Sequence, residues 1–230
     1  MKNKPIVIGV GGFARAGKDT FVKVARKILT ENGYSSEKLA FADALKIEIG
    51  PFIKEFYGID VWTDNTEEKT VIRPLLVAHG CQKRFQTNGK YWVDKVDEQI
   101  QHISSIRDVS KHVIFISDCR FPNEVNWTHE KWGGWFVHIK RYSMVQFYDK
   151  YGDDDGDPIR IFDKAPNDEE AKNDPICQQN ADYHLELETV IERELRVNGN
   201  KITTDDLMDN TYLNEEIKLC LTKCPFLTIK

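Results

Sequence analysis

A glycine-rich turn near the start of the sequence carries the residue types that bind phosphate groups. It reads Gly12-Phe13-Ala14-Arg15-Ala16-Gly17-Lys18-Asp19-Thr20 and follows the phosphate-loop pattern G-x-x-x-x-G-K-[S/T] at Gly12, Gly17 and Lys18. Glycines let the backbone fold so that several N–H groups point inward, and the helix that follows adds the positive end of its dipole. The turn therefore predicts a nest for the phosphates of ATP, formed by Gly12, Ala14, Ala16, Gly17, Lys18, Asp19 and Thr20.

Two features of this turn leave alternatives open. Asp19 stands where the pattern has a Ser or Thr whose hydroxyl binds magnesium, so we expect Asp19 to bind the ion directly, to bind it through water, or to face the second substrate. The overlapping run Gly9-Val10-Gly11-Gly12-Phe13-Ala14 also fits the dinucleotide pattern G-x-G-x-x-[G/A], with Glu31 about 20 residues further on. Because that pattern does not account for Lys18, the phosphate loop is favoured over the dinucleotide loop and over an accidental glycine turn.

A second candidate for chemistry is the carboxylate that ends an apolar run. Val113–Ser117 predicts a buried strand, and Asp118 follows it directly. This is the arrangement of a Walker-B strand, whose Asp holds magnesium or its water shell. An Asp after a buried strand is also often a helix cap or turn residue. Together with the phosphate loop, the run predicts Asp118 and Asp19 as metal ligands, with ATP and Mg²⁺ as cofactors.

Strands and helices must alternate to place these residues. Hydrophobic patterning predicts strands at 5–10, 39–42, 113–117, 135–139 and 182–187, and helices at 18–31, 44–57, 66–86, 91–107, from Pro122, and at 203–222. Asp43 is a candidate cap for the second helix. Residues 150–180 are polar and predict a mobile, lid-like loop or an irregular subdomain. The alternation predicts one α/β domain over residues 1–230, with a mostly parallel sheet flanked by helices.

Composition excludes several classes of protein. The chain has 230 residues and a net charge of −5, so a broad nucleic-acid-binding surface is not expected, although a local basic pocket is compatible. The sequence holds no run of about 18 apolar residues for a membrane span, and its start does not have the form of a secretory signal. Five cysteines without a C-x-x-C pair indicate reduced thiols, and we expect a cytoplasmic protein without membrane or nucleic-acid partners.

Several segments in order along residues 5–141 resemble the bacteriophage-type deoxynucleoside monophosphate kinases. The most specific is Asp118-Cys119-Arg120-Phe121-Pro122-Asn123-Glu124, together with Gly17-Lys18-Asp19-Thr20. The linking segments that fit the same pattern are Phe41-Ala42-Asp43-Ala44-Leu45-Lys46, Arg73-Pro74-Leu75-Leu76 with Gly80 and Arg84, and Trp92-Val93. Two departures stand out: Ala14 replaces a lysine of some relatives, and Asn167-Asp168-Glu169-Glu170 stands near the place of a His-Ser-Glu segment.

The resemblance implies a fold, an activity and a substrate site. The fold would be the three-layer P-loop kinase fold, with a helical substrate-binding insertion at about 43–107. The activity would be transfer of the γ-phosphate of ATP to a deoxynucleoside monophosphate for DNA precursor synthesis, in the host cytoplasm if the protein is viral, with a homodimer as the suggested assembly. The resemblance places the acceptor nucleotide against Phe41, Asp43, Arg73, Arg84, Trp92, Asp118, Arg120 and Glu124.

Residue chemistry gives these groups roles and also plainer alternatives. Phosphoryl transfer needs in-line positioning and charge neutralisation, so Arg73 and Arg120 would clamp the acceptor phosphate and Arg15 would reach the transferring group. We expect the catalytic residues to be Lys18, Arg15, Asp19 and Arg120. As alternatives, Arg73 and Arg84 fit a solvated helix face, and Phe41 and Trp92 fit a core. Two other functions remain open: a different P-loop small-molecule kinase, and a non-catalytic ATP-binding switch protein.

Overall fold

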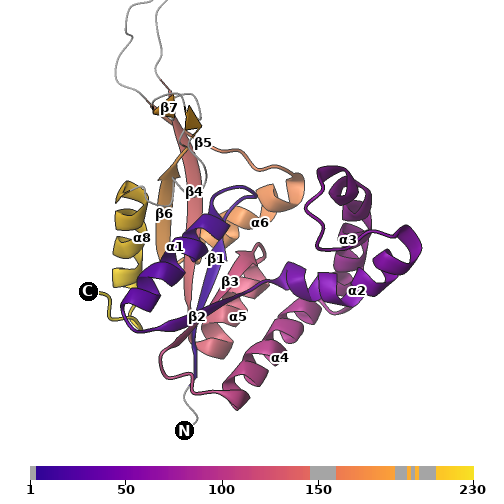
Figure 1. Cartoon of the computed structure of the whole chain (residues 1–230), viewed down its shortest axis with the longest axis horizontal. Coiled ribbons are helices and arrows are strands. Elements are labelled where there is room, and N and C mark those ends of the chain that lie inside the picture. Colours follow the sequence, from indigo (N-terminus) through magenta and orange to yellow (C-terminus); the bar gives the residue numbers. More distant parts are fainter. Residues whose placement is uncertain (1–3, 146–158, 190–195, 198–199, 202–210) are drawn as a thin grey trace, which may run out of the picture.

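The computed structural model of the chain describes residues 4–145, 159–189, 196–197, 200–201 and 211–230. A mostly parallel mixed sheet lies at its centre, with helices on both faces (Figure 1). The strands are β1 (Ile6–Gly11), β2 (Ser35–Leu39), β3 (His112–Cys119), β4 (Trp135–Val145), β5 (Ile159–Phe162) and β6 (Tyr183–Glu188), with a separate hairpin of β7 (Arg196–Val197) and β8 (Asn200–Lys201). The helices are α1 (Lys18–Glu31), α2 (Phe41–Tyr57), α3 (Thr66–Gln86), α4 (Lys90–Ile106), α5 (Pro122–Trp132), α6 (Asp168–Gln179) and α8 (Thr211–Lys223).

The sheet is built around β1 and β3. Its strands follow the order β2-β3-β1-β4, and both β5 and β6 pair with β4. All these pairings are parallel except that of β5 with β4. Strands β1 and β3 are buried almost throughout, which is the pattern expected of central parallel strands covered on both faces. The predicted strands at 5–10, 113–117, 135–139 and 182–187 are therefore confirmed.

Alternate side chains of the central strands enter two different cores. Ile8 of β1 and Phe115 of β3 pack in a core with α1 and α8, whereas Val7 and Ile114 pack in a second core with α2, α4 and α5. Helix α1, which follows β1, and helix α5, which follows β3, thus lie on opposite faces of the sheet. Neighbouring parallel strands that send the chain to opposite faces leave a crevice at their carboxyl ends. The fold places the candidate site in this crevice, because the loops after Gly11 and Cys119 both begin there.

Helices α2, α3 and α4 stand together beside the sheet (Figure 1). They confirm the helices predicted at 44–57, 66–86 and 91–107, and a small separate core of Ile53, Val61 and Ile72 joins part of this group. Within the described residues, no helix is long and apolar enough to cross a membrane.

Two predictions of local structure are wrong. The second strand is β2, at Ser35–Leu39, and not residues 39–42, because Phe41 already begins α2. Strand β2 forms one end of the sheet and has mostly polar, partly exposed residues, so it lacks the apolar run that the prediction relied on. Asp43 does not cap α2 either, since the N-cap position is Ala40 and no side chain of that residue can bond the helix end.

The predicted irregular segment at 150–180 is also wrong for its described part, while residues 150–158 lie outside the described residues. Residues 159–180 contain β5 and α6. The side chain of Asn167 accepts the backbone N–H of Glu170, and three acidic residues in the first turn suit the helix dipole. Helix α6 has few apolar residues that would predict it from the sequence, and one of these, Cys177, is buried.

The helix predicted at 203–222 corresponds to α8 over residues 211–222, while residues 203–210 lie outside the described residues.

Candidate functional site

The loop between β1 and α1 is shaped by two glycines at its ends. Gly12 has a φ of 123°, and a Cβ atom there would lie 2.2 Å from the carbonyl oxygen of Ile139. Gly17, with a φ of 94°, directly precedes α1. Both conformations are ones that residues with side chains rarely adopt. The tight course of the β1–α1 loop therefore accounts for the two glycines of the phosphate-loop pattern.

Lys18 turns its ammonium group into this loop. Its Nζ donates to the carbonyl oxygens of Gly12 at 2.8 Å and Phe13 at 2.7 Å, and the residue is only 8% exposed. Burial lowers the pKa of Lys18, and the positive charge of Arg120 lowers it further, while the carboxylates of Glu170 and Asp118 act in the opposite direction. The ammonium group is thus a cation held beneath the loop by the loop's own carbonyls.

The overlapping dinucleotide pattern has a structural explanation that involves no cofactor. Gly9 and Gly11 lie within β1, beside Phe136 of the neighbouring strand β4. A Cβ atom would come within 2.8 Å of the Phe136 ring at Gly9 and within 2.5 Å at Gly11. These glycines make room for a core aromatic ring, and Glu31 ends α1 instead of following a strand.

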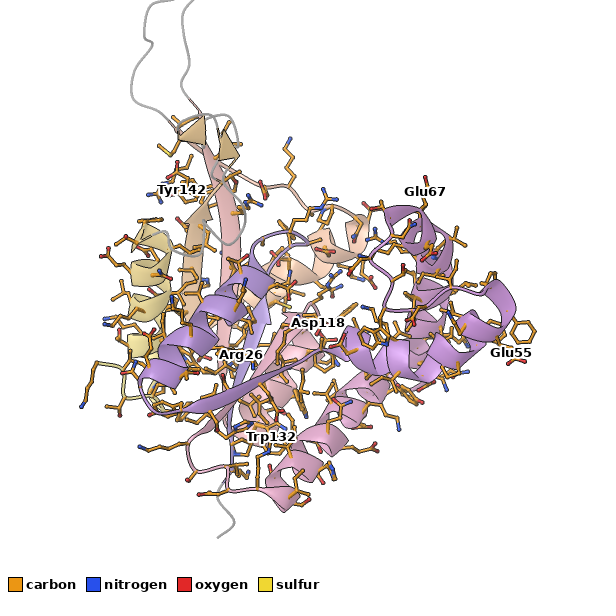
Figure 2. The ribbon with its side chains drawn as sticks, in the orientation of Figure 1. Arg26, Glu55, Glu67, Asp118, Trp132 and Tyr142 are labelled. Atoms are coloured by element: carbon orange, nitrogen blue, oxygen red, sulfur yellow. The ribbon has the colours of Figure 1, made fainter. Side chains whose placement is uncertain are left out.

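Asp118 fixes the start of α2. Its Oδ1 accepts the backbone N–H of Phe41 and its Oδ2 accepts that of Ala42, both at 2.8 Å. Burial raises the pKa of Asp118, against the lowering effect of these two hydrogen bonds and of Arg120. The carboxylate therefore acts as a helix cap supplied by β3, and Figure 2 places Asp118 between the sheet and the α2–α4 group.

Glu124 is the most buried polar group of the site, with an exposure of 1%. Its Oε1 accepts Nη2 of Arg84 at 2.8 Å, and its Oε2 accepts the backbone N–H groups of Arg120 at 2.7 Å and Phe121 at 3.1 Å. Burial raises the pKa of Glu124, and Arg84 opposes that shift. The guanidinium of Arg84 in turn lies 3.5 Å over the Phe121 ring. Glu124 thus holds α3 to the start of α5.

Arg120 and Glu170 connect the β3–α5 segment to the β1–α1 loop. Nη1 of Arg120, whose side chain is 43% exposed, donates to Oε1 of Glu170 at 3.0 Å. Oε2 of Glu170 accepts the backbone N–H of Ala14 at 2.9 Å. Sequence reasoning did not select Glu170. The spacing of Asn167 and Glu170 is typical of a helix start, but nothing in it indicates a partner 156 residues away.

A cavity of about 280 Å³ lies where α2, α3 and the β3–α5 segment meet. Seven of the eight predicted substrate-binding residues line it, and Asp43 does not. Those that line it are Phe41, Arg73, Arg84, Trp92, Asp118, Arg120 and Glu124. The structure therefore brings together residues that come from four separate segments of the sequence.

The aromatic residues of the cavity belong partly to the core. Phe41 packs edge-on against Trp127, with ring centroids 6.0 Å apart, and the indole N–H of Trp92 donates to the Gly80 carbonyl at 3.1 Å. Both rings are therefore core residues that also line the cavity, so the two interpretations of Phe41 and Trp92 are compatible. Arg73 is exposed on α3 and lines the same cavity.

The remaining predicted residues of the loop differ in their exposure. Arg15 is exposed, and its carbonyl accepts Nη1 of Arg141 at 3.2 Å. Ala16 is buried and uses its N–H to bond the Phe13 carbonyl at 3.1 Å, so this N–H closes the turn. Thr20 is half-buried in the first turn of α1.

The two predicted metal ligands, Asp118 and Asp19, each contact other groups of the protein in this arrangement. Each oxygen of Asp118 already accepts a backbone N–H. Asp19 is exposed and pairs with Lys38 of β2, at 2.7 Å between Nζ and Oδ1. Mg²⁺ prefers six oxygen ligands in octahedral geometry. Among the residues that the structure describes, no group of three or more His, Cys, Asp or Glu side chains is placed to hold a metal ion.

Comparisons with known proteins add little to this geometry. No family model and no curated protein matches the chain. A solved structure described as the crystal structure of APE1195 is 18% identical, with a TM-score of 0.29, and the alignment covers 60% of this chain and 62% of that one. The crystal structure of TT1252 from Thermus thermophilus is 12% identical, with a TM-score of 0.37, and the alignment covers 82% and 91%. The chain thus spans less than two thirds of APE1195, and at these TM-scores neither likeness bears on function.

Proposed function

We propose that the protein is a deoxynucleoside monophosphate kinase, which transfers the γ-phosphate of ATP to a deoxynucleoside monophosphate. One observation carries the proposal: Arg120 lines the cavity and is also linked through Glu170 to the Ala14 N–H of the β1–α1 loop. Arg120 thus connects a loop that has the phosphate-binding sequence pattern with a cavity large enough for a ligand. An enzyme that joins two phosphorylated substrates head to head needs this adjacency.

The donor side of the proposed reaction is the β1–α1 loop. Lys18 and the start of α1 supply positive charge there, and the turns at Gly12 and Gly17 let the loop wrap an anion. ATP is the proposed donor, accompanied by Mg²⁺. Lys18 would leave the carbonyls that it now contacts and bind the β- and γ-phosphates, since phosphate oxygens carry more negative charge than a carbonyl.

The acceptor side is the cavity, which combines cations with apolar walls. Arg73 and Arg120 can hold a phosphate through paired N–H groups, while Phe41, Leu45 and Trp92 offer surfaces for a flat base. A nucleoside monophosphate has both an anionic and a flat apolar part. The apolar walls therefore favour a nucleotide over a small polar phosphorylated metabolite, and the second phosphate site favours an enzyme over a switch protein.

The proposed reaction forms one bond and breaks one. An oxygen of the acceptor phosphate attacks the γ-phosphorus of ATP, and the bond from that phosphorus to the β,γ-bridging oxygen breaks, which releases ADP and the deoxynucleoside diphosphate. The attacking oxygen is already ionised at neutral pH, so no general base is required. Lys18 and Arg120 would offset the charge that shifts toward the leaving and transferred groups.

The direct test is ADP release from ATP and Mg²⁺ with each of the four common deoxynucleoside monophosphates in turn. We expect at least one acceptor to raise ADP release well above the rate without acceptor. We also expect Lys18→Ala to lower kcat/KM by at least about 100-fold, because a cation that stabilises the transition state is lost. Lys23→Ala, at an exposed position on the same helix, is the matched control.

Three outcomes would contradict the proposal in different ways. Turnover only with a phosphorylated metabolite that is not a nucleotide would support the other kinase. Tight ATP binding without transfer to any acceptor would support the switch protein. Full activity of the Lys18→Ala variant would show that the β1–α1 loop does not bind the phosphates through Lys18.

A further inference from the structure

The carboxylate of Glu170 occupies an unusual position for a structural glutamate. It is 6% exposed, and its oxygens accept the Ala14 N–H of the β1–α1 loop and the guanidinium of Arg120. The side-chain amide of Asn167, the N-cap residue that precedes α6, donates to Oε1 at 3.3 Å. None of these three donors belongs to α6 itself. Two of them, the Ala14 N–H and the Arg120 guanidinium, come from the segments that form the proposed phosphate site.

These two elements present the donors that an incoming phosphate would use. A backbone N–H of a phosphate-type loop and a guanidinium beside the acceptor cavity both prefer negatively charged oxygens. A carboxylate offers two such oxygens, and a phosphate offers three. Because both are anions, a phosphate and the Glu170 carboxylate cannot share Ala14 and Arg120 without strong repulsion at close range.

We propose that Glu170 is an internal anion, which holds the phosphate-binding donors when no substrate is bound and which a substrate phosphate must displace. The inference rests on the proposed function and deepens it, because it names the residue that competes with the phosphates of the substrates. Binding then exchanges the partner of Arg120 from Glu170 to the substrate, and the first turn of α6 moves away from the β1–α1 loop. The apparent affinity of the site is lower than its intrinsic affinity by the cost of this displacement.

The test is the affinity for inorganic tripolyphosphate and for ATP, measured by isothermal titration calorimetry without an acceptor. In Glu170→Gln, the amide oxygen can still accept from Ala14, but the amide N–H₂ faces the Arg120 guanidinium and no longer holds it. We expect affinity to rise on the order of tenfold, the value of one charge-assisted hydrogen bond relative to a neutral one. Asp168→Asn removes the same charge from the same turn of α6 and should change affinity by less than about twofold.

A second measurement keeps the inference testable if the variant folds poorly. Hydrogen–deuterium exchange of the wild-type protein should become faster over the first turns of α6, residues 168–174, when saturating tripolyphosphate is added. A purely structural Glu170 would keep those amides as protected as before. Unchanged or weaker affinity in Glu170→Gln, or unchanged exchange in the wild type, overturns the inference.

The outcomes also separate this inference from the proposed function. If the wild type binds tripolyphosphate and Lys18→Ala loses that binding, but Glu170→Gln binds as the wild type does, only the role of Glu170 fails. If the wild type and Glu170→Gln both fail to bind tripolyphosphate and ATP, the phosphate-binding role of the loop fails, and the inference falls with it.

Discussion

Replacing Glu124 by Ala tests whether this carboxylate holds the site together. The substitution removes the acceptor of the Arg84 guanidinium and of the backbone N–H groups of Arg120 and Phe121. Breaking a buried ion pair by removing one partner costs about 3–5 kcal/mol, because the other charge stays buried without compensation. Arg84 already has Nη1 buried without a hydrogen-bond partner among the described residues, so it has no ready alternative. We expect the free energy of unfolding to fall by about 3–4 kcal/mol.

The assay is urea unfolding of Glu124→Ala beside Glu130→Ala, an exposed glutamate on the same helix. The control should lose less than about 0.5 kcal/mol. The double variant Glu124→Ala with Arg84→Met should recover part of the loss, because it removes the stranded charge as well. A loss below about 1 kcal/mol in Glu124→Ala, or strict additivity in the double variant, would refute the role of Glu124 as the buried partner of Arg84.

Two further predictions concern the β1–α1 loop. The pKa of Lys18 is lowered in the folded protein, so between that lowered pKa and the ordinary value of 10.5 the unfolded chain binds more protons and stability rises with pH. Lys18→Met removes this pH dependence, and its stability relative to the wild type should therefore fall as the pH rises toward the ordinary lysine pKa of 10.5, as urea midpoints would reveal. A constant difference would contradict the burial of the charge. Gly12→Ala should lose about 3 kcal/mol or more in thermal unfolding, because its Cβ would meet the Ile139 carbonyl. Gly33→Ala, with a positive φ but open space around its Cβ position, should lose only about 1 kcal/mol, and equal losses would argue against the close contact.

The parts of the fold that the sequence predicts are those with a strong apolar signal. Strands β1 and β3 are continuous apolar runs because both of their faces are buried, and α1 and α4 show a regular apolar face. Strand β2 is not predicted because a strand at the end of a sheet is partly exposed and needs few apolar residues. Helix α6 is not predicted for a related reason, since it has few apolar residues and several of its contacts are polar.

The sequence selects most of the residues that line the cavity, but it does not predict the contacts that they make. The sequence pattern predicts a metal-binding role for Asp118, and the resemblance predicts an acceptor-binding role for Glu124. In the structure, both carboxylates accept backbone N–H groups at or beside the starts of helices. Such partners have no side-chain signature, so residue types and spacing do not reveal them. Glu170 could not be predicted for a similar reason, because its partner Ala14 offers only a backbone N–H.

The polarity of β2 has a consequence for the behaviour of the protein in solution. A strand at the end of a sheet has unpaired N–H and C=O groups, which can recruit strands from other molecules and begin aggregation. Strand β2 lies at one end of the sheet (Figure 1) and is five residues long. Its Glu37 pairs with Arg107, and its Lys38 pairs with Asp19 of α1. Charges fixed in this way oppose the addition of a further strand. The feature that makes β2 hard to recognise in the sequence therefore also protects the open edge of the sheet.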